Sequence, residues 1–148
     1  DRIVNLVAAK EIYGGPAIVI DYGIADTFDV INEKGEFITG LIAPGISICA
    51  DALYQRAAQL PKIEIKKPKS IIIKNTIGSI QAGIVLGHIG QTIHIIKELK
   101  KELELPHMKV IATGGLAKVI DSDRSIFDVL DPVLTLKGLK ILYEKNKL

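Results

Sequence analysis

An acidic residue at the end of an apolar strand is the first place in this sequence where chemistry could occur. Asp21 follows the apolar run 17–20. Gly23 comes next in the turn, and Thr27 lies where a second apolar run begins. A carboxylate in this setting can hold a cation or an ordered water beside a phosphate, while the glycine lets the backbone approach and the threonine offers a hydroxyl. An aspartate that only bonds local amides at a strand exit is the alternative, and the spacing leaves both open.

A second turn of small residues follows another apolar strand. Thr113, Gly114 and Gly115 leave that strand and open a short helix. Glycines here let a flat ligand lie on the backbone, near the positive end of the helix. A plain strand-to-helix turn explains the same residues, so the glycines are a candidate site with an open alternative.

Charged residues at the beginning of the chain form a third candidate. Asp1 and Arg2 stand at the start of a helical pattern, where a capping aspartate and a solvated arginine are the alternative explanation. The pattern begins at residue 1 without a methionine, which indicates a cut or processed chain.

The histidines and the cysteine do not predict a metal centre or a nucleophile. His88 and His94 lie on one predicted helix at a spacing that points them in different directions. His107 follows Pro106 in a loop. Cys49 has no base close to it in sequence and lies within an apolar helix, which favours a buried structural thiol.

Apolar periodicity divides the chain into helices and strands that could position these residues. Helices are predicted at 1–13, 46–60, 75–103 and 132–144, with a short helix after residue 115. Strands are predicted at 17–21, 27–32, 37–43, 109–112 and 125–130. The first three strands follow one another through short turns, so we expect them to be antiparallel.

The order of these elements predicts a single α/β domain over residues 1–148. Three antiparallel strands followed by alternating helices and strands are typical of a ribonuclease-H-like layout, in which helices cover a mixed sheet.

Glycines interrupt the long predicted helix. Four glycines lie inside it, and each lowers the stability of the helix by roughly 1 kcal/mol relative to alanine. They are Gly78, Gly83, Gly87 and Gly90. Gly83 and Gly87 share a face, where small residues let another backbone come close. Packing within the chain and a helix–helix dimer contact are both open, and the wide isoleucine coverage of the helix favours the dimer.

The composition excludes several classes of protein. The 148 residues carry a net charge of +2 with both signs spread along the chain, so we expect no nucleic-acid partner. The lysine-rich segment 62–69 is short and broken by Glu64 and Pro68, which favours a solvated edge over a phosphate-attracting patch.

A single cysteine excludes an internal disulfide and fits a reducing, cytoplasmic setting. No apolar run approaches the ~20 residues that a membrane span needs, so no membrane partner is expected.

Several segments together resemble the C-terminal half of the type III pantothenate kinases, which belong to the acetate and sugar kinase/actin-like superfamily. The resemblance extends over nearly the whole chain, and the order and spacing of its segments make it specific. They are DRIVN at 1–5, AIVIDYGIADTFD at 17–29, GLIAPGI at 40–46, LP at 60–61, KNT at 74–76, QAG at 81–83, ATGGL at 112–116 and DPVLTLKGL at 131–139.

On the substrate side, the resemblance implies transfer of the γ-phosphate of ATP to pantothenate, the first step towards coenzyme A, by a homodimer. It implies that Asp1 is the base that accepts the proton of the substrate hydroxyl. Arg2 would contact pantothenate, and Thr76 would reach pantothenate across the dimer.

On the nucleotide side, the resemblance implies a divalent metal such as Mg²⁺ and a monovalent cation such as K⁺. Asp21, Gly23 and Thr27 would form the second phosphate and cation loop, with Asp21 at the metal. Gly114 and Gly115 would form the adenosine loop.

The sequence departs from the family pattern in three respects. The N-terminal half, which supplies the first phosphate loop and half of the cleft, is missing, and half a cleft should be a very poor catalyst.

The family loop is close to Asp-Phe-Gly-Thr-Ala-Thr-Thr, whereas Ile24 and Asp26 stand here at two threonine positions. Ile24 removes a phosphate donor, and Asp26 is expected to repel phosphate unless a metal intervenes. Asp1 would also lie beside a free amino terminus.

The sequence therefore predicts an isolated, engineered half-domain with little or no kinase activity alone, which self-associates as a dimer. One alternative is a weakly active or partner-dependent pantothenate kinase. Another is a scaffold redesigned for assembly through the isoleucine- and glycine-rich helix.

Overall fold

The computed structural model describes residues 2–57, 59–121 and 125–147. Its helices are α1 (Arg2–Ala8), which continues as the π-helical turn η1 (Ala9–Tyr13), then α2 (Ile46–Arg56), α3 (Thr76–Glu102), α4 (Ala117–Ile120) and α5 (Leu134–Lys145). Its strands are β1 (Ala17–Tyr22), β2 (Ala25–Ile31), β3 (Phe37–Pro44), β4 (Lys109–Thr113) and β5 (Val129–Leu130).

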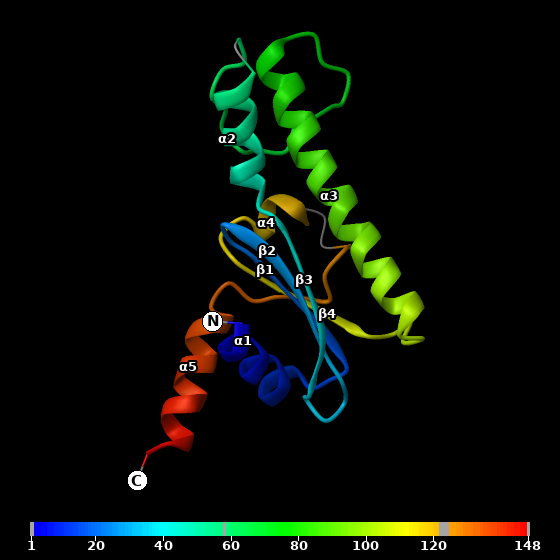
Figure 1. The fold of residues 1–148 in the computed structure, drawn as a ribbon, viewed down its shortest axis with the longest axis vertical. Coiled ribbons are helices and arrows are strands. Elements are labelled where there is room, and N and C mark those ends of the chain that lie inside the picture. The colour runs from blue at the N-terminus through cyan, green and yellow to red at the C-terminus, as the bar shows by residue number, and fades with distance from the viewer. Residues whose placement is uncertain (1, 58, 122–124, 148) are drawn as a thin grey trace.

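The five strands form one mixed sheet in the order β3-β2-β1-β4-β5 (Figure 1). The first three strands are antiparallel neighbours because short turns join them, as the sequence predicts. Strand β4 returns beside β1 in parallel after the long α3 crossover, and β5 is parallel to β4. This confirms the predicted α/β fold, a five-stranded mixed sheet with helices packed on its faces.

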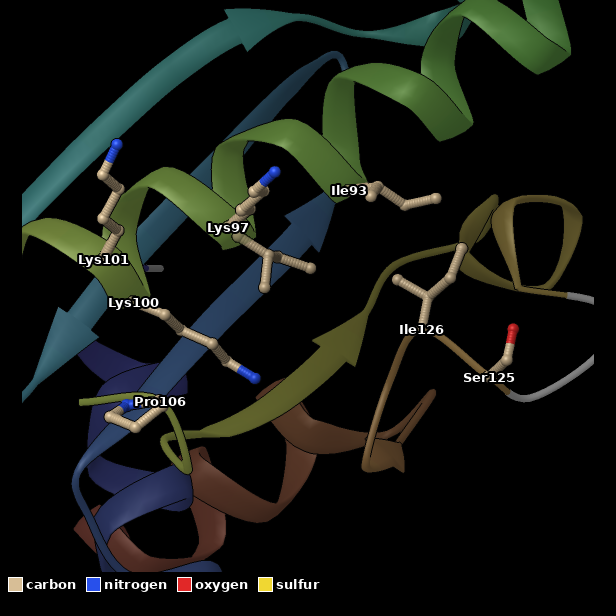
Figure 2. A pocket seen from close by; sticks show the side chains of 8 residues that line it. Ile93, Lys97, Lys100, Lys101, Pro106, Ser125 and Ile126 are labelled. Carbon is tan, nitrogen blue, oxygen red and sulfur yellow. The ribbon is translucent and has the colours of Figure 1, made fainter. Parts of the chain in front are cut away.

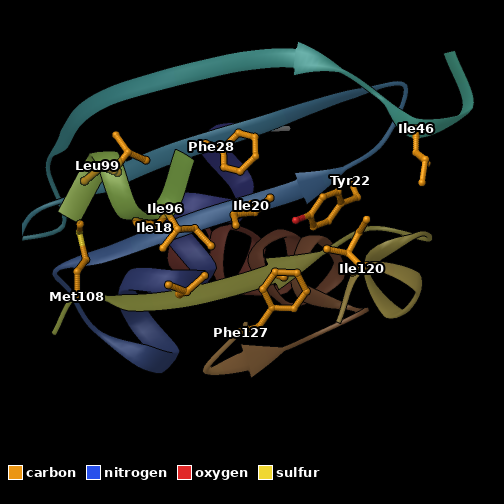
Figure 3. Packing of buried hydrophobic residues seen from close by; sticks show 14 of the residues in the cluster. Ile18, Ile20, Tyr22, Phe28, Ile46, Ile96, Leu99, Met108, Ile120 and Phe127 are labelled. Carbon is orange, nitrogen blue, oxygen red and sulfur yellow. The ribbon is translucent and has the colours of Figure 1, made fainter. Parts of the chain in front are cut away.

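Side chains alternate between the two faces of the sheet, and each face has its own apolar core. Ile18, Ile20 and Tyr22 of β1 face the C-terminal half of α3, where Ile96 and Leu99 pack against them (Figure 3). On the opposite face, a smaller cluster joins the sheet to the first and last helices. Its buried members are Ala8, Ala9, Ala17, Val19, Ile31, Ile111 and Leu134.

Helix α5 packs closely on α1. A Cβ added at Gly138 would collide with the carbonyl oxygen of Val4, so the two helices can cross at this distance only with glycine there. This pairing places the first turn of α5 beside the end of β1, where the candidate site lies.

Helix α2 and the N-terminal half of α3 extend together beyond the end of the sheet (Figure 1). The Asn75 side chain caps α3 by accepting a hydrogen bond of 2.7 Å from the backbone N–H of Gly78. Leu53 and Tyr54, which the sequence places on the buried face of α2, are exposed. The reason is that this part of α2 lies beyond the end of the sheet, beside α3 (Figure 1).

The predicted strand at 125–130 is wrong over most of its length, because only Val129–Leu130 pair with β4. The carboxylate of Asp121 accepts hydrogen bonds from the backbone N–H groups of Ser125, Ile126 and Phe127. These groups are therefore satisfied locally and do not enter a ladder.

The predicted apolar stripe of the long helix is confirmed at Ile80, Ile96 and Leu99, whereas Ile77 and Ile93 are exposed. The buried centre of α3 is polar and was not predicted. His88 and Thr92 lie there, and both contact the sheet. None of the described helices is long and apolar enough to cross a membrane.

Candidate functional site

Asp21 lies near the end of β1, where strand alternation directs its side chain towards α1 and α5. The Asn5 amide of α1 donates a hydrogen bond of 3.1 Å to Oδ2 of Asp21. Thr135 of α5 in turn donates one of 2.6 Å to Oδ1 of Asn5. Residues from three elements therefore fix the orientation of the Asp21 carboxylate.

The environment of Asp21 shifts the pKa of its carboxyl group upwards. Burial raises the pKa of the Asp21 carboxyl group, and the hydrogen bond from Asn5 opposes that shift. The nearby carboxylates of Asp26 and Asp29 push the pKa in the same direction as burial. A cation beside Asp21 would relieve this unfavourable charge, so the group is suited to bind one.

The second predicted turn lies directly beside Asp21. Strands β1 and β4 are parallel with Asp21 opposite Thr113, which brings the carboxyl ends of both strands to one edge of the sheet. Gly114 has a φ of +103°, and a Cβ there would collide with the backbone of Tyr22. Only glycine fits this close turn without strain, whereas Gly115 faces open space.

A pocket of about 340 Å³ joins the two turns. Its described lining residues are Asp21, Thr113, Gly114, Gly115, Lys118, Leu130, Pro132 and Thr135. The pocket thus combines a carboxylate, two hydroxyls and exposed backbone with a lysine. Such groups can hold an anion together with a cation.

Gly23 and Thr27 adjoin this pocket without being among its described lining residues. Thr27 of β2 pairs with Asp21 across the sheet, and the N–H of Gly23 donates to the carbonyl of Ala25 at 3.2 Å. Ile24, at the tip of the turn, is 82% exposed. The predicted loop residues are therefore neighbours, with Ile24 presented to solvent.

The expectation that Asp26 faces a bound phosphate is wrong. Asp26 is 1% exposed and lies on the α3 face of the sheet, one position out of phase with Asp21 and Thr27. Its Oδ2 bonds Nε2 of the buried His88, and Oδ1 has no hydrogen-bond partner among the described atoms. Strand alternation is the reason, since Asp21 pairs with Thr27 and Asp26 pairs with Tyr22.

Arg2 is held in an ion pair. Its Nε donates to Oδ2 of Asp29 at 2.9 Å, and its Nη2 contacts Oδ1 of the same carboxylate. A Cβ at Gly40 of β3 would collide with both groups, so this glycine makes room for the pair. The structure does not place Arg2 among the residues that line the pocket.

The structure separates Thr76 from the other candidate residues. Thr76 begins α3 and lines a different pocket of about 730 Å³ between α2 and α3. Asp1, the predicted base, lies outside the described residues.

The surroundings of the histidines and the cysteine do not favour a metal site or a nucleophile. His88 is buried and His94 is exposed, so they point in different directions as predicted. Cys49 is half-buried in α2, and burial raises the pKa of its thiol, which disfavours a nucleophilic thiolate. No group of three or more His, Cys, Asp or Glu side chains in the described segments is placed to hold a metal by itself.

Sequence reasoning missed three residues of this site: Asn5, Lys118 and Thr135. Asn5 carried a signal, because it is a polar residue within the otherwise apolar face of a short helix. Thr135 carried none, since only the packing of α5 on α1 brings it to Asn5.

The sequence matches a family model described as type III pantothenate kinase over residues 1–98. The chain belongs to this family. This confirms the family predicted from the order of the motifs.

Two solved structures share the fold of this family member. One is a conserved putative Baf family transcriptional activator from Campylobacter jejuni, with 23% identity, a TM-score of 0.61 and coverage of 99% of this chain and 63% of that one. The other is the ethanolamine utilization protein EutJ from Carboxydothermus hydrogenoformans, with 21% identity, a TM-score of 0.56 and coverage of 91% and 52%. The chain thus spans 52 to 63% of the length of these proteins.

Proposed function

We propose that the pocket between Asp21 and Gly115 is the nucleotide half-site of a pantothenate kinase. The observation that carries the proposal is the convergence of two distant turns, the ends of β1 and β4, on one pocket. Ligands of open α/β sheets bind at the carboxyl ends of neighbouring strands. Family membership supports ATP as the ligand, with the phosphates near Asp21 and the adenosine over Gly114 and Gly115.

The residues present fit a cation bound together with phosphate. One oxygen of Asp21 is engaged by Asn5, while the carboxylate as a whole lines the pocket. Mg²⁺ is commonly held by one or two carboxylates, with substrate phosphates and water completing its shell, so a single aspartate suffices. A bound cation would neutralise phosphate charge, and Thr113, Thr135 and Lys118 would orient the ligand around it.

For this chain alone we propose little or no kinase activity, together with self-association. Phosphoryl transfer depends on positioning and charge neutralisation from both sides of a cleft. The chain spans 52 to 63% of the length of its structural relatives, which supports an incomplete cleft. A weakly active or partner-dependent kinase and an assembly scaffold are the alternatives, and nucleotide binding separates them.

The test is a calorimetric titration of the chain with ATP, with and without Mg²⁺. Asp21→Asn should weaken Mg²⁺-dependent binding by about tenfold or more, which corresponds to roughly 1.4 kcal/mol. Gly115→Leu should weaken it as well, because the new side chain would enter the space that the ligand needs. Asp51→Asn, at an exposed carboxylate on α2, is the matched control and should leave binding unchanged. Absence of ATP binding in the unmodified chain would refute the half-site and favour the scaffold.

A second variant tests the β1–β2 turn. Ile24→Thr restores a hydroxyl at an exposed position and should increase ATP affinity if the turn contacts phosphate. An unchanged affinity would exclude the turn while leaving the pocket itself intact.

A further inference from the structure

A groove lies between the C-terminal half of α3 and the segment that leads into β5, and it shares no lining residue with the nucleotide pocket. It encloses about 570 Å³. Its described lining residues are Ile93, Ile96, Lys97, Lys100, Lys101, Pro106, Ser125 and Ile126 (Figure 2). Ile93 and Ile126 point towards each other across the groove, and Lys100 extends from α3 above Pro106.

The described lining of the groove carries positive charge without an acidic partner among its own residues. Three of its described lining residues are lysines and none is acidic. No ion pair in the described segments involves Lys97, Lys100 or Lys101. A second lysine-lined pocket, beside α5, differs in this respect, because Lys137 is paired there with Asp131 and Lys145 with Glu11.

Favourable interaction with the helix dipole accounts for only some of these lysines. Lys100 and Lys101 lie in the last turn of α3, where cations interact favourably with the helix dipole. Lys97 lies one turn earlier, four residues before Lys101, and like charges at this spacing destabilise a helix. Glu98 and Glu102 line the neighbouring pocket on the β3 side, so the two charge signs are segregated on opposite flanks of the helix.

The remaining surface of the groove is apolar. Ile93 is 49% exposed, Ile96 belongs to the edge of the core, and Ile126 is half-buried. The volume lies within the range of roughly 300 to 1,000 Å³ that is usual for small-molecule sites with apolar walls and a few placed polar groups. An apolar chain with one negatively charged end matches both features of this groove.

We propose that this groove binds a single-chain amphipathic anion of the fatty-acid class. The acyl chain would lie on Ile93, Ile96 and Ile126, and the charged head would lie at Lys100, which extends towards Pro106, while Lys97 and Lys101 add positive charge to the same stretch of α3 (Figure 2). Lysine binds carboxylate or phosphate as a point charge. The groove therefore selects a negative charge joined to an apolar chain, and the chemical type of the head group matters less.

The test follows the isoleucine methyl NMR signals of the unmodified chain during titration with dodecanoate below its micelle concentration. We expect saturable shifts confined to Ile93, Ile96 and Ile126. Lys100→Glu should weaken binding by about tenfold or more, and Lys100→Gln by less. Lys140→Glu removes an exposed lysine from α5 and should leave the affinity unchanged. The amide spectrum of each variant verifies its fold.

Two comparison ligands complete the design. Dodecyltrimethylammonium has the same chain with a positive head and should bind about tenfold more weakly or not at all. Equal binding of the two amphiphiles, or no effect of either Lys100 substitution, would overturn the proposal. Binding to anionic lipid vesicles without binding to free dodecanoate would also overturn it, because the patch would then recognise a membrane surface.

Discussion

Asp26 and His88 show how one pair of residues connects the long helix to the sheet. Both side chains are at least nine-tenths buried, at 1% and 4% exposure, and they bond directly between β2 and α3. Tyr22 and Thr92 form a second buried contact of 2.7 Å one turn further along α3. These polar contacts stand at the point where α3 leaves the sheet, so they define the position of the helix.

Removal of one partner of this pair should be costly. His88→Leu leaves the Asp26 carboxylate buried without its partner, and such a loss costs about 3 to 5 kcal/mol. Urea unfolding would measure the change. His94→Leu is the matched control on the same helix, and because His94 is exposed it should change stability by no more than about 0.5 kcal/mol. Equal effects of the two substitutions would contradict a specific role for the buried pair.

Gly40, like Gly114 and Gly138, is a residue whose small size the structure requires. Gly40→Ala forces a Cβ into Arg2 and Asp29, and overpacking of this kind costs about 1 to 3 kcal/mol. Gly115→Ala is the control, because a Cβ at Gly115 meets no neighbouring atom within 4 Å, so alanine should change stability by no more than about 0.5 kcal/mol. Thermal unfolding of both variants would measure the difference, and a neutral Gly40→Ala would contradict the close contact.

At the scale of elements, the pairing of the first and last helices depends on Asp131. This buried carboxylate accepts hydrogen bonds from the Tyr13 hydroxyl at 2.6 Å, from Lys137 at 2.7 Å and from the N–H of Val133 at 3.1 Å. Burial raises the pKa of Asp131, but these bonds outweigh burial and hold its pKa below the ordinary value of 3.8. The same contact raises the pKa of Tyr13.

The lowered pKa of Asp131 predicts a specific pH dependence. A carboxyl group with a depressed folded-state pKa stabilises the fold above its ordinary pKa, and that contribution is lost as the pH falls through the folded value. Asp131→Asn should therefore be less stable than the unmodified chain at neutral pH. The difference should shrink as the pH falls below 3.8. Urea unfolding at a series of pH values measures this, and a difference independent of pH would show that charge is not the cause.

At the scale of the whole molecule, α2 and the N-terminal half of α3 form an extension with little cover (Figure 1). Apart from the local backbone of α3 itself and the adjacent residues, a Cβ at Gly83, Gly87 or Gly90 would meet none of the described atoms within 4 Å. Packing within the described part of the chain therefore does not account for these glycines. Ile77 and Leu86 on the same helix are exposed as well, and this is the surface at which we propose that a second copy of the chain packs.

This proposal predicts a change of mass in solution. Gly87→Leu would fill the small-residue face and prevent close approach of a second helix, so the mass measured by light scattering should fall towards that of one chain. Lys140→Leu adds the same side chain on α5 and should leave the mass unchanged. If Gly87→Leu also leaves it unchanged, any contact between copies lies elsewhere on the surface.

The sequence by itself determined the order and type of nearly every element. Strand alternation, the turn at Gly35 and the break at Pro44 are local signals, and they predicted the three antiparallel strands without knowledge of the rest of the chain. The order of the motifs likewise predicted the family. The two turns at Asp21 and Gly114 were also found from sequence. A carboxylate or a glycine directly after an apolar strand is a local pattern, so it can be recognised without knowledge of the fold.

Only the tertiary structure decided which of these residues meet. Asp26 is turned away from Asp21 because successive strand residues face opposite sides of a sheet, and His88 could be recognised as its partner only once α3 was packed on the sheet. The Asn5–Thr135 clamp on Asp21 has the same origin, since it joins the first helix to the last. Helices and strands are determined by interactions between residues close in sequence, so local patterns predict them. A site is assembled by contacts between elements that are far apart in sequence, and only the tertiary structure shows these contacts.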